Sequence, residues 1–101
     1  MGERSPGVVE VAVHTFGMLR MRTGQARIDV RLASGTTVEG LLRHLAEDQD
    51  EGFLDVVVRP PGERQISTLI LNGRTLQLPR DLQHQLSTGD QLYLIPPIAG
   101  G

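Results

Sequence analysis

The sequence predicts an α+β domain in which one main helix packs on one face of a mixed β-sheet. Three observations lead to this prediction. Two runs near the start of the chain alternate apolar and polar residues with the period of two that marks a strand with one buried face. One later stretch changes to the helical period. Short apolar runs separated by turn residues then follow to the end of the chain.

The composition limits the chemistry that the chain can perform. Its 101 residues suit one domain, residues 1–101, with a flexible N-terminal tail at 1–7 and an extended C-terminal tail at 96–101. There is no cysteine, which excludes disulfides, thiolate metal sites and cysteine nucleophiles. All ten basic residues are arginine, so there is no lysine amine for Schiff-base chemistry or for acylation.

Charge and hydropathy exclude several classes of partner. The net charge is −2 and there is no basic stripe, so we expect no nucleic-acid partner. No apolar run approaches the roughly 20 residues of a membrane span, and the first residues lack the apolar segment of a secretory signal. We therefore expect a cytoplasmic protein without a membrane partner. The three histidines, His14, His44 and His84, have no second ligand at useful spacing, so we expect them to be solvent-exposed and expect no metal site.

Residues 8–16 and 26–34 predict an opening β-hairpin. Both runs alternate apolar and polar side chains, the second one strictly. The connection at 17–25 carries two glycines, which favours a loop between the strands. The apolar positions are Val9, Val11 and Val13 in the first run and Ala26, Ile28, Val30 and Leu32 in the second.

A helix is predicted from about Thr37 to Asp48, because the apolar residues follow the i, i+3, i+4, i+7 spacing of an amphipathic helix. Thr36 and Glu39 have the spacing of a capping box, in which each side chain satisfies a backbone N–H at the start of the helix. Gly40 lowers helix propensity by roughly 1 kcal/mol relative to Ala. Close approach of the helix to the sheet is one plausible compensation.

The segment from Asp48 to Gln65 is the least readable. Residues 53–58, "FLDVVV", are compatible with a short strand, and residues 59–64, "RPPGER", must form a turn or an extended loop because proline cannot donate a backbone hydrogen bond. The acidic run Glu47, Asp48, Asp50 and Glu51 fits the solvated end of the helix better than a surface for a basic enzyme.

The last third of the chain predicts three short strands. Asn72-Gly73 between apolar residues favours a hairpin with a type I′ turn. The polar stretch after Pro79 predicts a short turn or helix, and a turn at Gly89-Asp90 leads into the last strand.

The predicted element order is β-β-α-β-β-β. A crossover through the helix would make the first and last strands parallel neighbours at the centre of the sheet. That arrangement is the β-grasp, or ubiquitin-like, fold.

The C-terminal segment "IPPIAGG", residues 95–101, combines a stiff base with a slender tip. Pro96 and Pro97 hold an extended form, so less entropy is lost when the segment docks. Gly100 and Gly101 have no Cβ, so the end of the chain could enter a narrow channel in another protein. The terminal carboxylate could then react there.

Four segments together resemble the small, sulfur-carrying subunit of molybdopterin synthase over most of the chain, from about Val8 to Gly101. These are "FGMLRMRTG", "LNGRTL", "GDQLYLIPP" and the terminal "PPIAGG", which is the most specific. The thiamine-pathway sulfur carriers share the final Gly-Gly but usually lack the two prolines. The sequence departs from the shortest members of the family at residues 48–65, which is longer here.

The resemblance implies a protein that is itself a substrate and has no active site or permanently bound cofactor of its own. A partner, an adenylating enzyme that uses ATP and Mg, would activate the carboxylate of Gly101, and sulfur would then replace the adenylate to leave a thiocarboxylate. The second partner would be the large synthase subunit, on which the sulfur reaches a pterin precursor.

The resemblance also implies which residues meet these partners. Phe16 and Ile95 match two apolar positions that, in this family, help form the patch that meets the large synthase subunit. Arg20 matches a basic position near that surface, where it would pair with an acidic residue of the partner. The tail residues Pro96, Pro97, Ile98, Ala99 and Gly100 would enter the partner with Gly101.

Other interpretations stay open from the sequence. Phe16 and Ile95 could be ordinary core residues, and Arg20 a solvated surface arginine. The protein could instead be a ubiquitin-like protein modifier, a sulfur carrier for thiamine or cysteine biosynthesis, or a binding module with an incidental tail. The missing lysines favour the carrier weakly, because a lysine-free modifier cannot build side-chain-linked polymers on itself.

Overall fold

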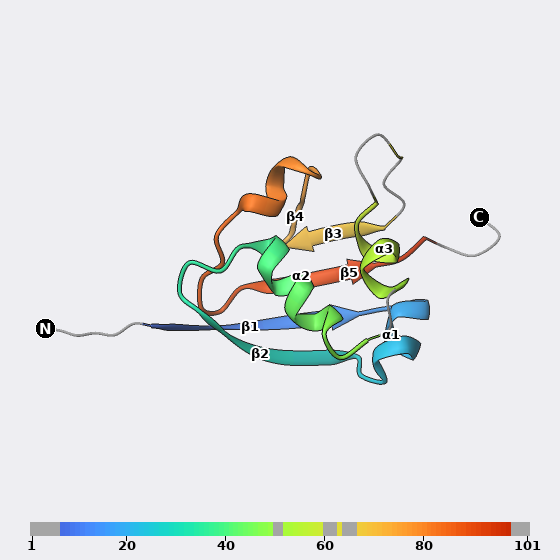
Figure 1. Cartoon of the computed structure of the whole chain (residues 1–101), viewed down its shortest axis with the longest axis horizontal. Helices are drawn as coiled ribbons and strands as arrows, with labels where there is room; N and C mark the ends of the chain where they lie inside the picture. The colour runs from blue at the N-terminus through green and yellow to red at the C-terminus, as the bar shows by residue number, and fades with distance from the viewer. Residues whose placement is uncertain (1–6, 50–51, 60–62, 64–66, 98–101) are drawn as a thin grey trace, which may run out of the picture.

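The computed structural model describes residues 7–49, 52–59, 63 and 67–97, and its architecture is a five-stranded mixed sheet with helices on one face (Figure 1). The predicted fold class is confirmed. In chain order the elements are β1 (Val8–Thr15), α1 (Gly17–Thr23), β2 (Arg27–Ala33), α2 (Val38–Ala46), α3 (Gly52–Val57), β3 (Thr68–Leu71), β4 (Arg74–Thr75), the 3₁₀ helix η1 (Arg80–Gln83) and β5 (Gln91–Ile95).

The sheet has the strand order β2-β1-β5-β3-β4, so the last strand lies in its centre. β1 and β5 are parallel, with Ala12 opposite Gln91 and Thr15 opposite Leu94. β1 pairs antiparallel with β2, and β5 pairs antiparallel with β3. The predicted parallel pairing of the first and last strands is therefore confirmed. Because both strands run in the same direction, the chain leaves β5 at the end of the sheet where α1 follows β1 (Figure 1).

The core lies between the sheet and the helices α2 and α3. Alternate residues of each strand point toward these helices, as the period of two predicted. The most deeply buried large side chains come from strands and helices alike: Val13, Leu69, Leu92, Leu94, Leu41, Leu42, Val38, Phe53, Val57 and Leu19. The opposite face of the sheet carries no helix in the part of the chain that the structure describes (Figure 1).

The predicted main helix is confirmed as α2, but its predicted cap is wrong. The oxygen Oγ1 of Thr37, not of Thr36, accepts a hydrogen bond from Gly40 N at 3.2 Å. The hydroxyl of Thr36 donates to Ala33 O in the preceding turn. Glu39 accepts from Arg43 and from Gln83, so its carboxylate ties α2 to η1 and is not part of a capping box.

The predicted reason for Gly40 is also wrong. A Cβ built at Gly40 would lie 2.9 Å from Cγ2 of Thr36, and the only other described atom within 4 Å is Oγ1 of Thr37. The close approach is therefore to the turn before the helix and not to the sheet.

Two local predictions fail because short helices form where local propensity favours other structure. Residues 17–25 were expected to be a loop, but Gly17–Thr23 form α1, which buries Leu19 completely. Gly24 ends this helix in the left-handed conformation, with φ 75°. Residues 53–58 are compatible in sequence with a short strand, but Gly52–Val57 form α3, in which Phe53 and Val57 are one turn apart and both fully buried.

The turn predictions near the end of the chain are confirmed. Asn72 and Gly73 both have positive φ, 52° and 86°, as a type I′ turn requires. The side chain of Asn72 accepts from Gln91 N at 2.8 Å and donates to Asp90 Oδ1 at 2.9 Å, so the hairpin turn fixes the start of β5.

The short helix predicted after Pro79 is η1. There Gln77 N donates to Asp81, and this hydrogen bond together with Arg80 lowers the pKa of the Asp81 carboxyl.

Within the described ranges, no helix has the length and apolar composition needed to span a membrane.

Replacing Phe53 with alanine tests the role of α3. The variant Phe53→Ala removes a fully buried ring between α3 and the sheet and should lower the free energy of unfolding by about 3–5 kcal/mol. Met21→Ala, which trims a side chain that is 84% exposed, is the control and should change it by about 0.5 kcal/mol or less. Urea denaturation followed by circular dichroism measures both. Equal, small effects would show that α3 does not pack as described.

Candidate functional site

The C-terminal segment leaves the sheet from its central strand. β5 ends at Ile95, Pro96 is buried, and Pro97 is exposed. The predicted site residues Ile98, Ala99, Gly100 and Gly101 lie outside the described residues. The geometry of the site therefore concerns the base of the tail, which we define as Pro96 and Pro97, the two residues after the end of β5.

Pro96 packs against the first residue of α1. Gly17 has φ 52°, and a Cβ built on it would lie 3.2 Å from Cγ of Pro96. Contacts of this kind are tighter than most real Cβ contacts, so a glycine is needed here both for its backbone conformation and for the space. α1 contacts both β1 and β5. The base of the tail is thus held between the central strand and α1 and does not simply continue the strand.

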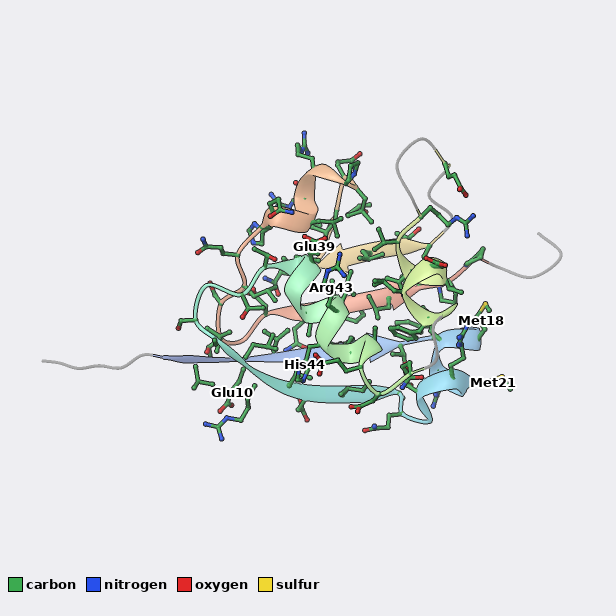
Figure 2. The ribbon with its side chains drawn as sticks, in the orientation of Figure 1. Glu10, Met18, Met21, Glu39, Arg43 and His44 are labelled. Atoms are coloured by element: carbon green, nitrogen blue, oxygen red, sulfur yellow. The ribbon has the colours of Figure 1, made fainter. Side chains whose placement is uncertain are left out.

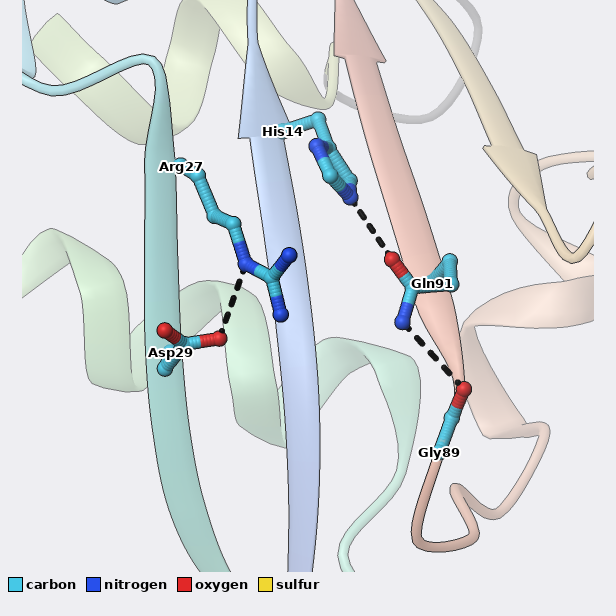
Figure 3. A network of polar contacts seen from close by, with 5 residues as sticks. All are labelled: His14, Arg27, Asp29, Gly89 and Gln91. Carbon is cyan, nitrogen blue, oxygen red and sulfur yellow. Dashed lines mark hydrogen bonds and ion pairs between the residues drawn. The ribbon is translucent and has the colours of Figure 1, made fainter.

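Three rings line the helix-free face of the sheet next to the base of the tail. His14 and Tyr93 stack with centroids 4.4 Å apart and planes at 11°, and Phe16 and Tyr93 lie 6.3 Å apart at 23°. Nε2 of His14 is also 2.7 Å from Oε1 of Gln91 (Figure 3). The expectation that His14 is merely solvent-exposed is wrong, because the parallel register places it beside Tyr93.

Phe16 and Ile95 lie on the surface side of the sheet and not in the core. Phe16 follows the last residue of β1 and is 41% exposed, and Ile95 is half-buried at the end of β5. Neither belongs to the cluster of buried apolar residues that forms the core. The interpretation of both as ordinary core residues is therefore wrong, and both flank the base of the tail.

Sequence reasoning missed two methionines on α1. Met18 is 44% exposed and Met21 84% exposed, and both project from the end of the molecule where α1 lies (Figure 2). The signal was present in "GMLRM", where only Leu19 points inward once the segment is recognised as a helix. We name Phe16, Met18, Met21 and Ile95 the apolar rim, because all four residues border the base of the tail or lie on the helix that packs against it.

The positive charge beside the apolar rim comes from α1. Arg20 is exposed, and among the described residues it makes no ion pair. Arg22 lies in the last turn of the same helix, which carries no acidic residue in its first turn. An exposed cation within an apolar surface suits an acidic group on a partner that also buries apolar area.

A shallow hollow of about 420 Å³ lies on the helix-free face, over the beginning of β5. Ala12 and Gln91, which are opposite each other in β1 and β5, are among the residues that line it. Its charged walls are already paired: Arg27 lies 3.0 Å from Asp29 (Figure 3). Arg31 lies 3.6 Å from Glu10. This hollow is therefore a weak candidate for a small-molecule site.

The described residues hold no cluster of three or more histidine and acidic side chains suited to a metal ion. His44 and His84 are exposed, as expected, and His44 lies 4.0 Å from Glu47 at the end of α2. Glu47 and Asp48 are exposed as well, while Asp50 and Glu51 lie outside the described residues. Among the described residues, the features next to the base of the tail are therefore the apolar rim, the stacked rings and the exposed Arg20.

Comparison with known proteins agrees with this geometry. The model of the ThiS family matches residues 13–101. The HVO 2177 protein of Haloferax volcanii has a TM-score of 0.78 and 25% identity, with 100% of this chain and 94% of that chain covered. Small archaeal modifier protein 1 of Methanosarcina acetivorans has a TM-score of 0.72 and 22% identity, covering 93% and 98%.

A Pyrococcus furiosus protein named for molybdopterin converting factor, subunit 1, also has a TM-score of 0.72 and 22% identity. The match covers 89% of this chain and 99% of that chain. At 22% identity these likenesses establish the shared fold. No curated protein matches the chain in sequence.

The contact between Gly17 and Pro96 can be tested with two alanine variants. Gly17→Ala and Gly24→Ala both force alanine into the left-handed conformation, at a cost of about 1–2 kcal/mol. Only the first also places a Cβ against Pro96, because nothing lies within 4 Å of a Cβ at Gly24. We expect Gly17→Ala to lower the melting temperature further and to shift the amide resonances of Leu94 and Ile95, which Gly24→Ala should leave in place. Identical spectra at β5 for the two variants would contradict the packing described.

Proposed function

Since the chain belongs to the ThiS family of ubiquitin-like sulfur carriers, we propose that it carries sulfur as a thiocarboxylate on Gly101 and donates it in molybdopterin biosynthesis, as the small subunit of the synthase. The observation that supports this most is the path of the tail. The parallel pairing of β1 and β5 directs residues 95–97 out of the sheet centre, and Pro96 packs on α1 beside the apolar rim. A terminus presented in this way is suited to enter the active site of another protein.

The proposed chemistry takes place on the carboxylate of Gly101. A carboxylate is a poor acyl donor, so the activating enzyme would use ATP and Mg to form an acyl adenylate with release of pyrophosphate. Sulfur at the oxidation level of hydrosulfide then attacks the acyl carbon, the bond to AMP breaks, and loss of the S–H proton to water leaves the thiocarboxylate. Transfer of that sulfur to the pterin precursor and hydrolysis return the carboxylate. The carrier itself contributes no acid, base or cofactor to these steps.

The apolar rim and Arg20 form the proposed docking surface for both partners, the adenylating enzyme and the large synthase subunit. Apolar side chains at the centre and charge at the edge are typical of protein interfaces. Thioether side chains such as Met18 and Met21 adapt to differently shaped partners. This suits a carrier that must bind two enzymes in turn with the same end of the molecule.

The choice of the molybdopterin pathway rests on Pro96 and Pro97 and on the segments that resemble the synthase subunit. The second candidate function is conjugation to other proteins, since a carrier and a modifier share the activated glycine terminus. The likeness to small archaeal modifier protein 1 is consistent with either, because it concerns the fold. The two functions differ in what is transferred. A modifier transfers its acyl carbon to a lysine amine of another protein, whereas a carrier gives up only the sulfur.

Deletion of Gly101 tests the reacting group. The full chain, co-expressed with the activating enzymes of its host, should gain the mass difference of one sulfur in place of one oxygen at its terminus. The deletion variant should gain none, and its melting temperature should stay within about 2 °C, because an exposed terminal residue contributes little to the core. Intact-mass spectrometry and thermal denaturation measure both effects.

A chain with one alanine appended after Gly101 is the matched control, because it keeps both glycines but moves the carboxylate. It should also stay unmodified. A full chain that remains unmodified with every activating enzyme of the host would refute the proposal, and amide adducts on lysines of other proteins would favour the modifier.

The docking surface is tested by placing a charge on it. Met21→Asp should raise the carrier concentration for half-maximal adenylation by about tenfold or more, which corresponds to about 1.4 kcal/mol of binding free energy. Stability should hardly change, because Met21 is 84% exposed. Arg74→Glu on β4, at the opposite edge of the sheet from β2, is the control and should leave adenylation unaffected. Equal effects of the two variants would exclude α1 from the docking surface.

A further inference from the structure

The arginines of this chain are distributed over the whole described surface. Lysine is among the commonest residues of soluble domains, yet the 101 residues contain ten basic residues and no lysine. The eight in the described ranges are Arg20, Arg22, Arg27, Arg31, Arg43, Arg59, Arg74 and Arg80. Two of them, Arg20 and Arg22, belong to α1, the helix that packs against the base of the tail.

The contacts of these arginines do not explain why lysine is absent. Arg27 donates one hydrogen bond to Asp29 at 3.0 Å, and Arg43 donates one to Glu39 at 3.3 Å. Both guanidinium groups use a single nitrogen, and both side chains are more than half exposed. An ammonium group could replace either one, because only a two-pronged or stacked contact requires the planar guanidinium. Exposed pairs of this kind contribute about 0–1 kcal/mol.

Two arginines that make no ion pair with a described residue do not explain the absence of lysine either. Arg20 on α1 and Arg74 on β4 are both exposed, and neither makes an ion pair with any described residue. Positive charge at these positions could come from lysine equally well. The property that these four arginines share, and that lysine lacks, is chemical and not geometric.

That property is resistance to acylation. A lysine amine has a pKa near 10.4, so a small fraction is neutral and nucleophilic at physiological pH, whereas the guanidinium of arginine stays protonated. An amine that attacked the activated carbonyl of Gly101 would form a C–N bond while the bond to AMP breaks, and its proton would pass to water. The product is a stable amide, which ends the carrier cycle.

An amine on α1 would be within reach of the tail. Arg20 lies about 4.5 Å along the helix axis from Gly17, which packs against Pro96. The four residues after Pro97 can extend at most about 14 Å. Arg74 is farther away, because it pairs with Leu71 and through it with Leu92, five residues or about 17 Å along the sheet from Pro97.

We propose that the arginine-only surface lets this chain present positive charge beside its tail without offering an amine that its own activated terminus could acylate. This inference rests on the proposed activation of Gly101. It has a further consequence for conjugation. Where the tail is joined to a lysine of another protein, each attached chain can be extended only through an α-amine, so the product carries single copies and no side-chain-linked polymers.

The test uses the full chain with a C-terminal thioester in place of the carboxylate, which activates the tail without any enzyme. In Arg20→Lys, the amine should attack the acyl carbon of the same chain and release the thiol, leaving an intrachain amide at position 20. We expect at least tenfold more amide than the native chain forms with its α-amine. Arg74→Lys is the matched control, because Arg74 is also exposed and makes no ion pair with a described residue. Its amine should react only with the tail of another chain, which gives dimers whose yield depends on concentration. Intact mass and peptide mapping identify the products.

Two outcomes would overturn the inference. One is that Arg20→Lys forms no more intrachain amide than the native chain does. The other is that the native chain acylates itself as fast as the variant. Neither outcome depends on an activating enzyme, so a failure of the proposed function is recognised separately, by the absence of adenylation of the native chain. Circular dichroism of both variants confirms that they are folded.

Discussion

The parallel pairing of β1 with β5 is the constraint on which the rest of the structure depends. It places the last strand in the centre of the sheet, between β1 and β3, so the C-terminal segment starts from the most firmly held part of the molecule. It also brings the end of β5 to the helix that follows β1. Without this register, Pro96 would not meet Gly17, and the tail would leave the domain at a sheet edge or at the opposite end.

The two faces of the sheet have separate roles. One face is covered by α2 and α3 and contains the core, which stabilises the domain. The other face has no helix among the described elements and carries stacked rings and paired charges, with Phe16 and Ile95 of the apolar rim at the end where the tail begins. Side chains alternate between the faces along each strand, so the same strands can build a stable core and a binding surface.

The division of labour within a sulfur carrier follows from this arrangement. In the function that we propose, the folded domain supplies position, direction and a surface to be recognised, while the reacting carbon is that of Gly101. Such a protein needs few reactive side chains, and reactive amines near the tail would be harmful. The absence of cysteine and lysine and the presence of ten arginines are consistent with that requirement.

The sequence alone determined the strands, the main helix and the Asn72-Gly73 turn, because hydrophobic period and turn chemistry are local properties of the chain. It also indicated the β-grasp order and the candidate tail. It did not determine α1 and α3, since short helices depend on the burial of Leu19 and Phe53 against distant residues. It could not show the stacking of His14 on Tyr93, the contact of Pro96 with Gly17 or the exposure of Met18 and Met21. Only the tertiary structure decides these features, because each joins residues that are far apart in the chain or depends on which side of a helix faces the core.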